Sequence, residues 1–136
     1  MVHEKRIEIR WRDVDAFRHV NNAVYATYLE ECRDEWAVRA LGDVGDVWDY
    51  VLARVAIDFR EELTQEDDEV LVRCTLERIG TSSLTLREEI RKLDGTLSAE
   101  AESVLVARDR ETGRSRPLTE AEREALRAAL PIPSGS

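Results

Sequence analysis

The stretch YATYLEECRDEWAVRALG, residues 25–42, decides the fold of this chain. Its apolar side chains recur at helical spacing, at Leu29, Cys32, Trp36 and Ala40. Charged residues fall largely on the other positions, which is typical of an amphipathic helix, and Gly42 is a suitable C-terminal stop. At about 1.5 Å per residue this helix is about 30 Å long, so we predict that it is the central element of the core.

The segments on both sides of this helix alternate between apolar and polar residues, as strands with one solvent-exposed face do. A first strand has its apolar positions at Ile7, Ile9 and Trp11. After the helix we expect strands over residues 51–60, 70–77, 83–91 and 97–108. The strand over 51–60 has the apolar positions Val51, Ala53, Val55, Ile57 and Phe59. Asp94-Gly95 predicts a hairpin between the last two strands, because glycine tolerates a positive φ.

Two connections differ in character. Residues 42–50 are rich in Asp and Gly, which is typical of turns, although Val47, Trp48 and Tyr50 could cover the mouth of a pocket, and we assign this segment to no element. The acidic tract 61–69 predicts an exposed connection, since so many like charges disfavour burial.

A last helix is predicted from Thr119, where Glu122 completes a capping box, to Leu130, before Pro131. The order of elements, a strand, a long helix and then a run of antiparallel strands, predicts an α+β domain with the helix against one curved sheet. We expect residues 1–133 to form a single domain and residues 134–136 to be a frayed C-terminus.

Composition excludes several function classes. The 29 acidic and 20 basic residues give a formal net charge of -9, which disfavours binding to nucleic acid or to an anionic membrane surface. Recognition of an anionic ligand therefore needs local Arg residues or a helix N-terminus. The N-terminal residues are charged, and no apolar run has the length of a membrane span, so a cytoplasmic location is expected.

Metal and nucleotide chemistry also lack support in the sequence. Cys32 and Cys74 have no metal-ligand spacing, and we expect both to be reduced core residues. The chain contains no Gly-rich phosphate loop, no Gly-x-Ser-x-Gly elbow and no His/Cys cluster. We predict neither a bound metal nor a separate cofactor.

The stretch DVDAFRHVNNAVY, residues 13–25, holds the reactive side chains. With Tyr28 it resembles the motif of hot-dog-fold acyl-CoA thioesterases of the 4-hydroxybenzoyl-CoA thioesterase type: Asp-x-Asp, a short loop often with Gly-His, then Val-Asn-Asn and Tyr-x-x-Tyr on the helix. The resemblance extends more loosely over the whole chain. It implies a hot-dog fold, in which a curved antiparallel sheet wraps around a long central helix, and hydrolysis of an acyl-CoA.

The resemblance also implies roles for individual residues. Asp15 would be the nucleophile or general base on the thioester carbon, and Asp13 would be structural. The amide that polarises the thioester carbonyl falls on the backbone N–H of Asn22. Chemistry agrees, because a thioester needs an attacking oxygen and donors for its carbonyl oxygen. Asn21 or Asn22 can cap the helix, and the unpaired N–H groups of its first turn are such donors.

Other residues in and after this stretch are further candidates for the site, and some of them have two possible roles. Arg18 stands where the family often has a loop Gly. It is either an exposed variant or a residue of the pocket. His19 orders the loop through hydrogen bonds or transfers a proton. Val20 and Tyr25 are candidate substrate-binding residues by their place in the motif. Two carboxylates on the helix, Glu30 and Glu31, are read as solvent-exposed rather than catalytic.

The segment Arg78-Ile79-Gly80-Thr81-Ser82-Ser83 resembles the strand entrance near which hot-dog enzymes hold the coenzyme A phosphates and pantetheine. Arg78, Gly80, Thr81 and Ser82 are therefore candidate substrate-binding residues, and a simple turn is the alternative. The resemblance further implies a homodimer or homotetramer with sites formed between subunits, because a single sheet leaves an edge and an apolar face uncovered.

Two other functions remain open at this point. One is a non-catalytic acyl-binding or assembly module, in which Asp15 has only a structural role. The other is a hot-dog hydratase or dehydratase. The hydratase type uses an Asp-x-Asn-x-x-His run, whereas here Asn21 follows His19, and this order counts against dehydration.

Overall fold

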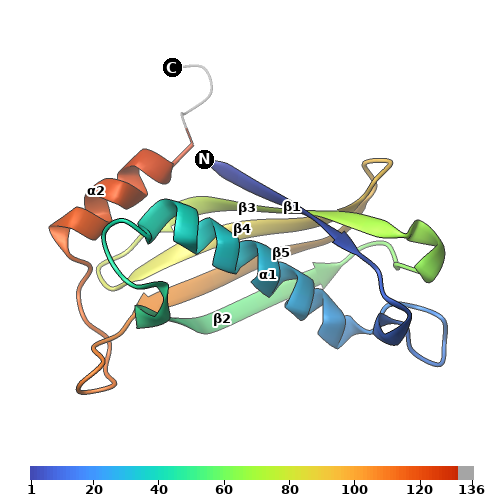
Figure 1. Ribbon diagram of the computed structural model, residues 1–136, viewed down its shortest axis with the longest axis horizontal. Helices are drawn as coiled ribbons and strands as arrows, with labels where there is room; N and C mark the ends of the chain where they lie inside the picture. The colour runs from blue at the N-terminus through green and yellow to red at the C-terminus, as the bar shows by residue number, and fades with distance from the viewer. Residues whose placement is uncertain (132–136) are drawn as a thin grey trace.

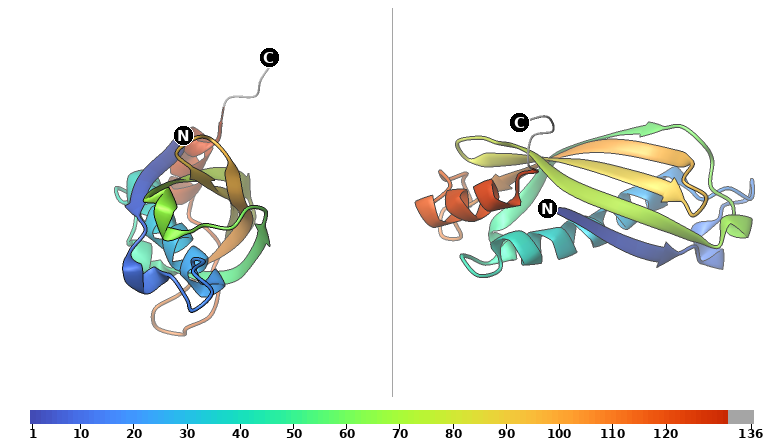
Figure 2. Two further views of the ribbon diagram at one scale, coloured as in Figure 1. Left: turned by 90° about the vertical axis from the view of Figure 1, so that its right-hand side faces the viewer. Right: turned by 90° about the horizontal axis from the view of Figure 1, so that it is seen from above.

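A computed structural model describes residues 1–131 and confirms an α+β hot-dog fold (Figure 1). Five antiparallel strands form one sheet in the order β1-β3-β4-β5-β2. The strands are β1 (Val2–Glu8), β2 (Tyr50–Phe59), β3 (Glu69–Ile79), β4 (Ser83–Lys92) and β5 (Leu97–Ala107). The sheet curves around the long helix α1 (Asn22–Leu41), as an end-on view shows (Figure 2).

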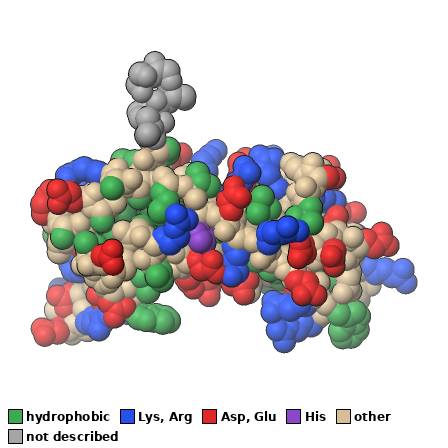
Figure 3. All heavy atoms as spheres, turned by 45° about the horizontal axis from the view of Figure 1, so that its top comes forward, with side chains coloured by type: hydrophobic (Ala, Val, Ile, Leu, Met, Phe, Trp, Pro, Cys, Tyr) green, Lys and Arg blue, Asp and Glu red, His purple; other side chains and the backbone are tan. Residues whose placement is uncertain are grey.

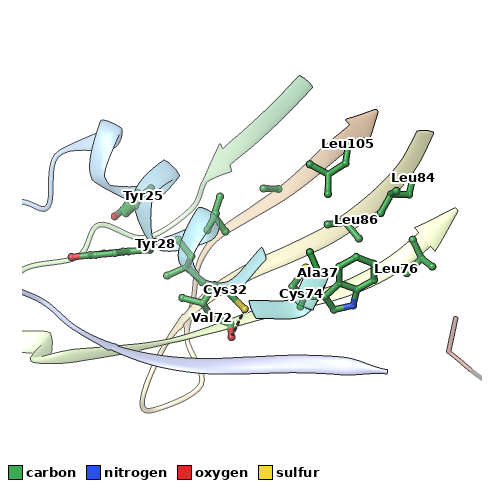
Figure 4. Packing of buried hydrophobic residues seen from close by; sticks show 14 of the residues in the cluster. Tyr25, Tyr28, Cys32, Ala37, Val72, Cys74, Leu76, Leu84, Leu86 and Leu105 are labelled. Carbon is green, nitrogen blue, oxygen red and sulfur yellow. Dashed lines mark hydrogen bonds between the residues drawn. The ribbon is translucent and has the colours of Figure 1, made fainter. Parts of the chain in front are cut away.

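Helix α1 forms as the sequence predicts. The side chain of Asn21 caps it by accepting the Ala23 N–H at 2.9 Å, and Gly42 follows its last residue. One side of the helix is buried against β1, β3 and β4. Figure 4 shows the helix side chains Tyr28, Cys32 and Ala37 beside strand residues such as Val72, Cys74 and Leu86.

A shorter helix, α2 (Glu120–Ala129), has the predicted capping box between Thr119 and Glu122. The predicted hairpin at Asp94-Gly95 is also present, with φ of +95° at Gly95. The frayed end expected at residues 134–136 lies outside the described residues. Within residues 1–131, each helix is too short or too polar to cross a membrane.

The predicted first strand was wrong at its C-terminal end. β1 begins at Val2 and stops at Glu8, and Trp11 opens a short 3-10 helix, η1 (Trp11–Asp13), with its side chain 81% exposed. The cause is local, because the carboxylate of Asp13 accepts the Arg10 N–H at 2.9 Å and folds the chain into a turn. The apolar alternation therefore ends at Ile9, which is buried.

The predicted alternation in β2 was wrong in its first half. A bulge lies between Leu52 and Arg54, so Ala53 has no partner on β5. Before the bulge, Leu52 pairs with the buried Leu105, whereas after it Val55 pairs with the buried Ser103. Cross-strand partners share a face of the sheet, so the inner face changes from even to odd positions at the bulge.

The acidic tract 61–69 is mostly exposed as predicted, with one exception. Leu63 is fully buried, and its backbone accepts the Val20 N–H at 2.8 Å. The same residue donates its own N–H to the Tyr25 hydroxyl at 3.1 Å. This tract, which includes the 3-10 helix η3 (Gln65–Asp67), is thereby attached to the start of α1.

Candidate active site

The loop before α1 is organised around Asp15. The Asp15 carbonyl accepts the Arg18 N–H at 2.9 Å, and the Asp15 N–H donates to the His19 carbonyl at 2.9 Å. One carboxylate oxygen, Oδ1, accepts the N–H of Phe17 at 2.9 Å and that of His19 at 3.4 Å. Among the described residues, no group donates to the other oxygen, Oδ2. The half-buried carboxylate thus has one oxygen that fixes the loop and one that is free for chemistry.

Arg18 adopts a backbone conformation that favours glycine. Its φ is +70°, in the left-handed region where a side chain costs about 1–2 kcal/mol. The tight turn that begins at Asp15 therefore keeps the geometry of a glycine loop. The Arg18 side chain is exposed, and it also lines a cavity beside Asp15.

The cavity beside Asp15 has a volume of about 530 Å³. Its lining comprises Trp11, Val14, Asp15, Phe17, Arg18, His19, Thr64, Gln65 and Glu66. Trp11 and Phe17 are 81% and 80% exposed, so two aromatic rings stand at the surface on either side of the Asp13–Asp15 segment. Sequence reasoning missed both rings, since Trp11 was assigned to a strand and Phe17 carries no motif signal.

The start of α1 supplies hydrogen-bond donors near this loop. Asn21 donates its N–H to the Asp13 carbonyl at 3.0 Å, which ties the cap of the helix to the Asp13–Asp15 segment. Asn22 is the first helical residue, and its N–H has no acceptor within the described part of the chain. Such a free N–H at the positive end of a helix can stabilise developing negative charge.

Asp13 has a structural position, in contrast to Asp15. It is 4% exposed, and its Oδ2 accepts the Tyr28 hydroxyl at 2.7 Å and the Arg10 N–H at 2.9 Å. Burial alone would raise the pKa of Asp13, but these hydrogen bonds outweigh it and hold the pKa below its usual value. Burial and the Asp13 carboxylate raise the pKa of Tyr28. Asp13 therefore joins the loop to α1 as a carboxylate.

Three further predicted site residues surround the loop. His19 Nε2 lies 2.9 Å from a carboxylate oxygen of Glu62, and both side chains are exposed. Val20 is 3% exposed, and Tyr25 is 2% exposed with its ring 5.0 Å from that of Phe59. Since the Tyr25 hydroxyl already accepts a backbone N–H, contact of Tyr25 with a substrate stays a prediction.

The predicted coenzyme A segment lies at the other end of α1 from Asp15 (Figure 1). It is the turn between β3 and β4, in which Gly80 donates its N–H to the Ser83 carbonyl at 2.7 Å. A Cβ at Gly80 would approach Ser83 Oγ to 2.5 Å, so a side chain at this position would displace the Ser83 hydroxyl. Arg123 of α2 donates to the carbonyls of Gly80 and Thr81, at 3.0 Å each. Within one chain, these residues and Asp15 are not brought together.

The remaining members of this segment are also engaged. The Arg78 guanidinium donates to Thr85 Oγ1 at 3.4 Å, and the Ser82 carbonyl accepts the Ala107 N–H at 2.8 Å. Across residues 1–131, no group of three His, Cys, Asp or Glu side chains could hold a metal ion. Cys32 and Cys74 are buried free thiols, and burial raises the pKa of Cys32 to about 12.

Comparison with known proteins identifies the family. The profile of the thioesterase-like superfamily matches residues 9–130. The chain belongs to this family. The prediction of a hot-dog thioesterase is thus confirmed at the level of family and fold, and the reaction class of this thioesterase is thioester hydrolysis. The comparison with curated protein sequences gave no match.

Solved structures resemble this thioesterase over nearly their whole length. A predicted thioesterase from Bacillus stearothermophilus is 29% identical, with coverage of 98% of this chain and 100% of that chain and a TM-score of 0.87. A thioesterase from Thermus thermophilus, complexed with coenzyme A and Zn, is 32% identical, with 96% of each chain covered and a TM-score of 0.84. A 1,4-dihydroxy-2-naphthoyl-CoA thioesterase from Synechocystis is 18% identical, covers 93% of this chain and 96% of that chain at a TM-score of 0.77, and shows the fold alone.

Proposed function

We propose that this thioesterase hydrolyses the thioester of an acyl- or aroyl-coenzyme A to the free acid and coenzyme A, with Asp15 as nucleophile or general base. The observation that carries the proposal is the Asp15 carboxylate, which is fixed through Oδ1 while Oδ2 remains free in an open cavity. As a base it takes a proton from water, whose oxygen attacks the acyl carbon. As a nucleophile it forms an anhydride that water then opens. In both routes the C–S bond breaks and the sulfur leaves as a thiolate that takes up a proton.

Stabilisation of the oxyanion comes from the start of α1. Negative charge develops on the carbonyl oxygen when the acyl carbon is attacked, and a preorganised N–H donor lowers the energy of that state. The free N–H of Asn22 is the donor that the structure offers, at the positive end of a 20-residue helix. We assign His19 to ordering of the loop through Glu62, with proton transfer as its alternative role.

Assembly of two copies through β2 is part of the proposal. Both edges of the sheet carry ion pairs, such as Lys5 with Glu35 on β1 and Arg54 with Glu102 on β2, but β2 exposes more apolar side chains than β1 does. Leu52, Val55 and Phe59 of β2 are 44%, 37% and 45% exposed. In the view of Figure 3, acidic and basic side chains are interspersed over much of the surface. An unpaired apolar edge favours a homodimer, or a homotetramer built from such dimers.

A site between subunits would also reunite the two separated halves of the predicted site. Two copies that join through β2 in antiparallel fashion bring opposite ends of their helices together. Residues Arg78, Gly80, Thr81 and Ser82 of one copy would then lie toward Asp15 of the other, where they could hold coenzyme A. The complex of the Thermus thermophilus thioesterase with coenzyme A supports this ligand class.

Release of free thiol from a panel of acyl-CoAs tests the reaction. We expect Asp15→Asn to lower kcat by about 10²- to 10⁴-fold, because a positioned acid or base contributes a factor of that size. The matched control is Asp43→Asn, an exposed carboxylate at the other end of α1. Acyl-CoA binding without thiol release, equal in wild type and Asp15→Asn, would instead identify a binding module.

A further inference from the structure

A second cavity lies between α1 and β2 and shares no lining residue with the cavity beside Asp15. Its volume is about 380 Å³. Apolar side chains make up most of its wall: Ala37, Val38, Val47, Trp48, Leu52 and Leu105. The polar lining consists of Glu30, Arg33, Asp34 and Tyr50.

The wall of this cavity contains an exposed tryptophan on a turn whose backbone is held by hydrogen bonds. Trp48 is 79% exposed on the 3-10 helix η2 (Val47–Asp49). The Asp46 carboxylate accepts the backbone N–H of Trp48 at 3.0 Å, and Arg110 pairs with both Asp46 and Asp49. The Trp48 N–H and then Arg110 hold the pKa of Asp46 below its usual value. The backbone of the turn is thus fixed where the large apolar side chain of Trp48 lines the cavity, and an apolar ligand would cover that side chain.

The unpaired charges around the cavity are negative. Arg33 is neutralised, because its guanidinium binds the buried Glu88 at 2.9 and 3.1 Å and Ser103 at 3.0 Å. The described residues provide no cation that pairs with Glu30 or Asp34. Burial and then the Glu30 charge raise the pKa of Asp34, as expected for two carboxylates on one side of a groove. The cavity is therefore apolar with a negative rim.

We propose that this cavity binds the acyl group of the substrate against Trp48 and selects uncharged apolar acyl groups over those that end in a carboxylate. The inference rests on the proposed function and names its substrate class. An uncharged chain or ring gains from burial against the apolar wall. A terminal carboxylate would be desolvated next to Glu30 and Asp34, and both effects oppose its binding.

The acyl group in this cavity would react with Asp15 of a second copy. Asp34 lies twelve residues along α1 from Asn22, which at about 1.5 Å per residue is about 18 Å from the start of the helix. Asp15 of the same chain is at that far end. An antiparallel partner joined through β2 places its own helix start toward this cavity, and the exposed Leu52 lies both in the cavity wall and on the free edge.

Binding of thioether analogues tests the cavity without requiring any hydrolysis. Isothermal titration calorimetry compares S-hexyl-coenzyme A, S-(4-carboxybutyl)-coenzyme A and free coenzyme A. We expect Trp48→Ala to weaken binding of the hexyl analogue by about tenfold and to leave free coenzyme A unchanged, because one apolar contact is lost. Leu93→Ala, an exposed apolar residue in the β4–β5 turn, is the matched control and should bind as wild type does.

A second variant tests the charge selection. Wild type should bind the hexyl analogue more tightly than the carboxybutyl analogue. Asp34→Asn should lower the ratio of these two affinities severalfold. Equal affinity of Trp48→Ala and wild type for the hexyl analogue would overturn the proposal. So would a Trp48→Ala protein that sediments as a monomer where wild type is a dimer, since Trp48 would then serve the contact between copies. Selective binding without thiol release from any acyl-CoA would refute the proposed function and leave the cavity assignment intact.

Discussion

Two 3-10 turns at opposite ends of the molecule perform the same task by different means. η1 presents Trp11, 81% exposed, beside the Asp15 cavity, and η2 presents Trp48, 79% exposed, at the cavity between α1 and β2. The first turn is anchored from inside by the buried carboxylate of Asp13. The second is anchored from outside by Arg110, whose side chain is 60% exposed.

The difference in burial predicts which anchor contributes to stability. Hydrogen bonds to a buried carboxylate are strong, and their loss leaves donors unsatisfied in the interior. Ion pairs at the surface are screened by water and contribute little to unfolding. The Asp13 anchor should therefore stabilise the whole domain, whereas the Arg110 anchor should only position its tryptophan.

The largest effect is expected for Asp13→Ala. The substitution removes the acceptor of the Tyr28 hydroxyl and of the Arg10 N–H, so the free energy of unfolding should fall by about 3 kcal/mol. Urea denaturation at pH 7 measures this change, with the exposed Asp43→Ala as control. A loss no larger than that of the control would show that the buried anchor is not a stability element.

Removal of the hydroxyl alone should have a smaller effect. Tyr28→Phe keeps the ring and deletes one hydrogen bond to Asp13, for an expected loss of about 1–2 kcal/mol. The double variant with Asp13→Ala should be little worse than Asp13→Ala alone, because the two groups share one interaction. Strict additivity of the two unfolding free energies would contradict the shared contact.

Acid should weaken the same anchor by a smaller amount, since a protonated Asp13 still offers its oxygens as acceptors. The folded pKa of Asp13 is lowered relative to the unfolded chain. Its contribution to stability is therefore complete above the unfolded value of about 3.9 and is lost as the pH falls through the folded pKa. Urea denaturation at pH 6 and pH 3 should show a steeper loss for wild type than for Asp13→Asn, and parallel losses would exclude this role.

The smallest effect on stability is expected at the second turn. Arg110→Gln removes both ion pairs of η2, yet the free energy of unfolding should not change measurably, because Arg110 and Asp46 are exposed and Asp49 is only partly buried. Affinity for S-hexyl-coenzyme A should nevertheless fall, by less than Trp48→Ala produces. Unaltered affinity would mean that Trp48 holds its position without Arg110, whereas a large loss of stability would reverse the contrast between the two turns.

Periodic features of this fold could be predicted from sequence, because they repeat over many residues. The apolar spacing from Leu29 to Ala40 fixes α1, and alternation fixes the strands. The positions that failed depend on single contacts: one carboxylate at Asp13 turns the chain before Trp11, and one extra residue at Ala53 changes the inner face of β2. The secondary-structure propensities of the residues indicate neither the turn at Asp13 nor the bulge at Ala53.

The candidate site shows the same division. The order of residues from Asp13 to Tyr25 pointed to Asp15 and to the cap at Asn21, because both depend on local chain geometry. The separation of Gly80 from Asp15 depends on strand lengths and on the direction of the turn, so the motif could not reveal it. The support of Trp48 by Arg110 joins residues about sixty positions apart, which no local pattern encodes.

The bulge at Ala53 limits the register in which another strand can pair with the free edge of β2. If apolar and polar side chains alternate regularly along an edge strand, shifting the neighbouring strand by two residues restores the same pattern of contacts. Several registers of the two strands are then nearly equal in energy. The change of parity in β2 removes this translational symmetry. Only one alignment of an incoming strand can then match the side chains on both sides of the bulge, and open-ended stacking of further strands is disfavoured.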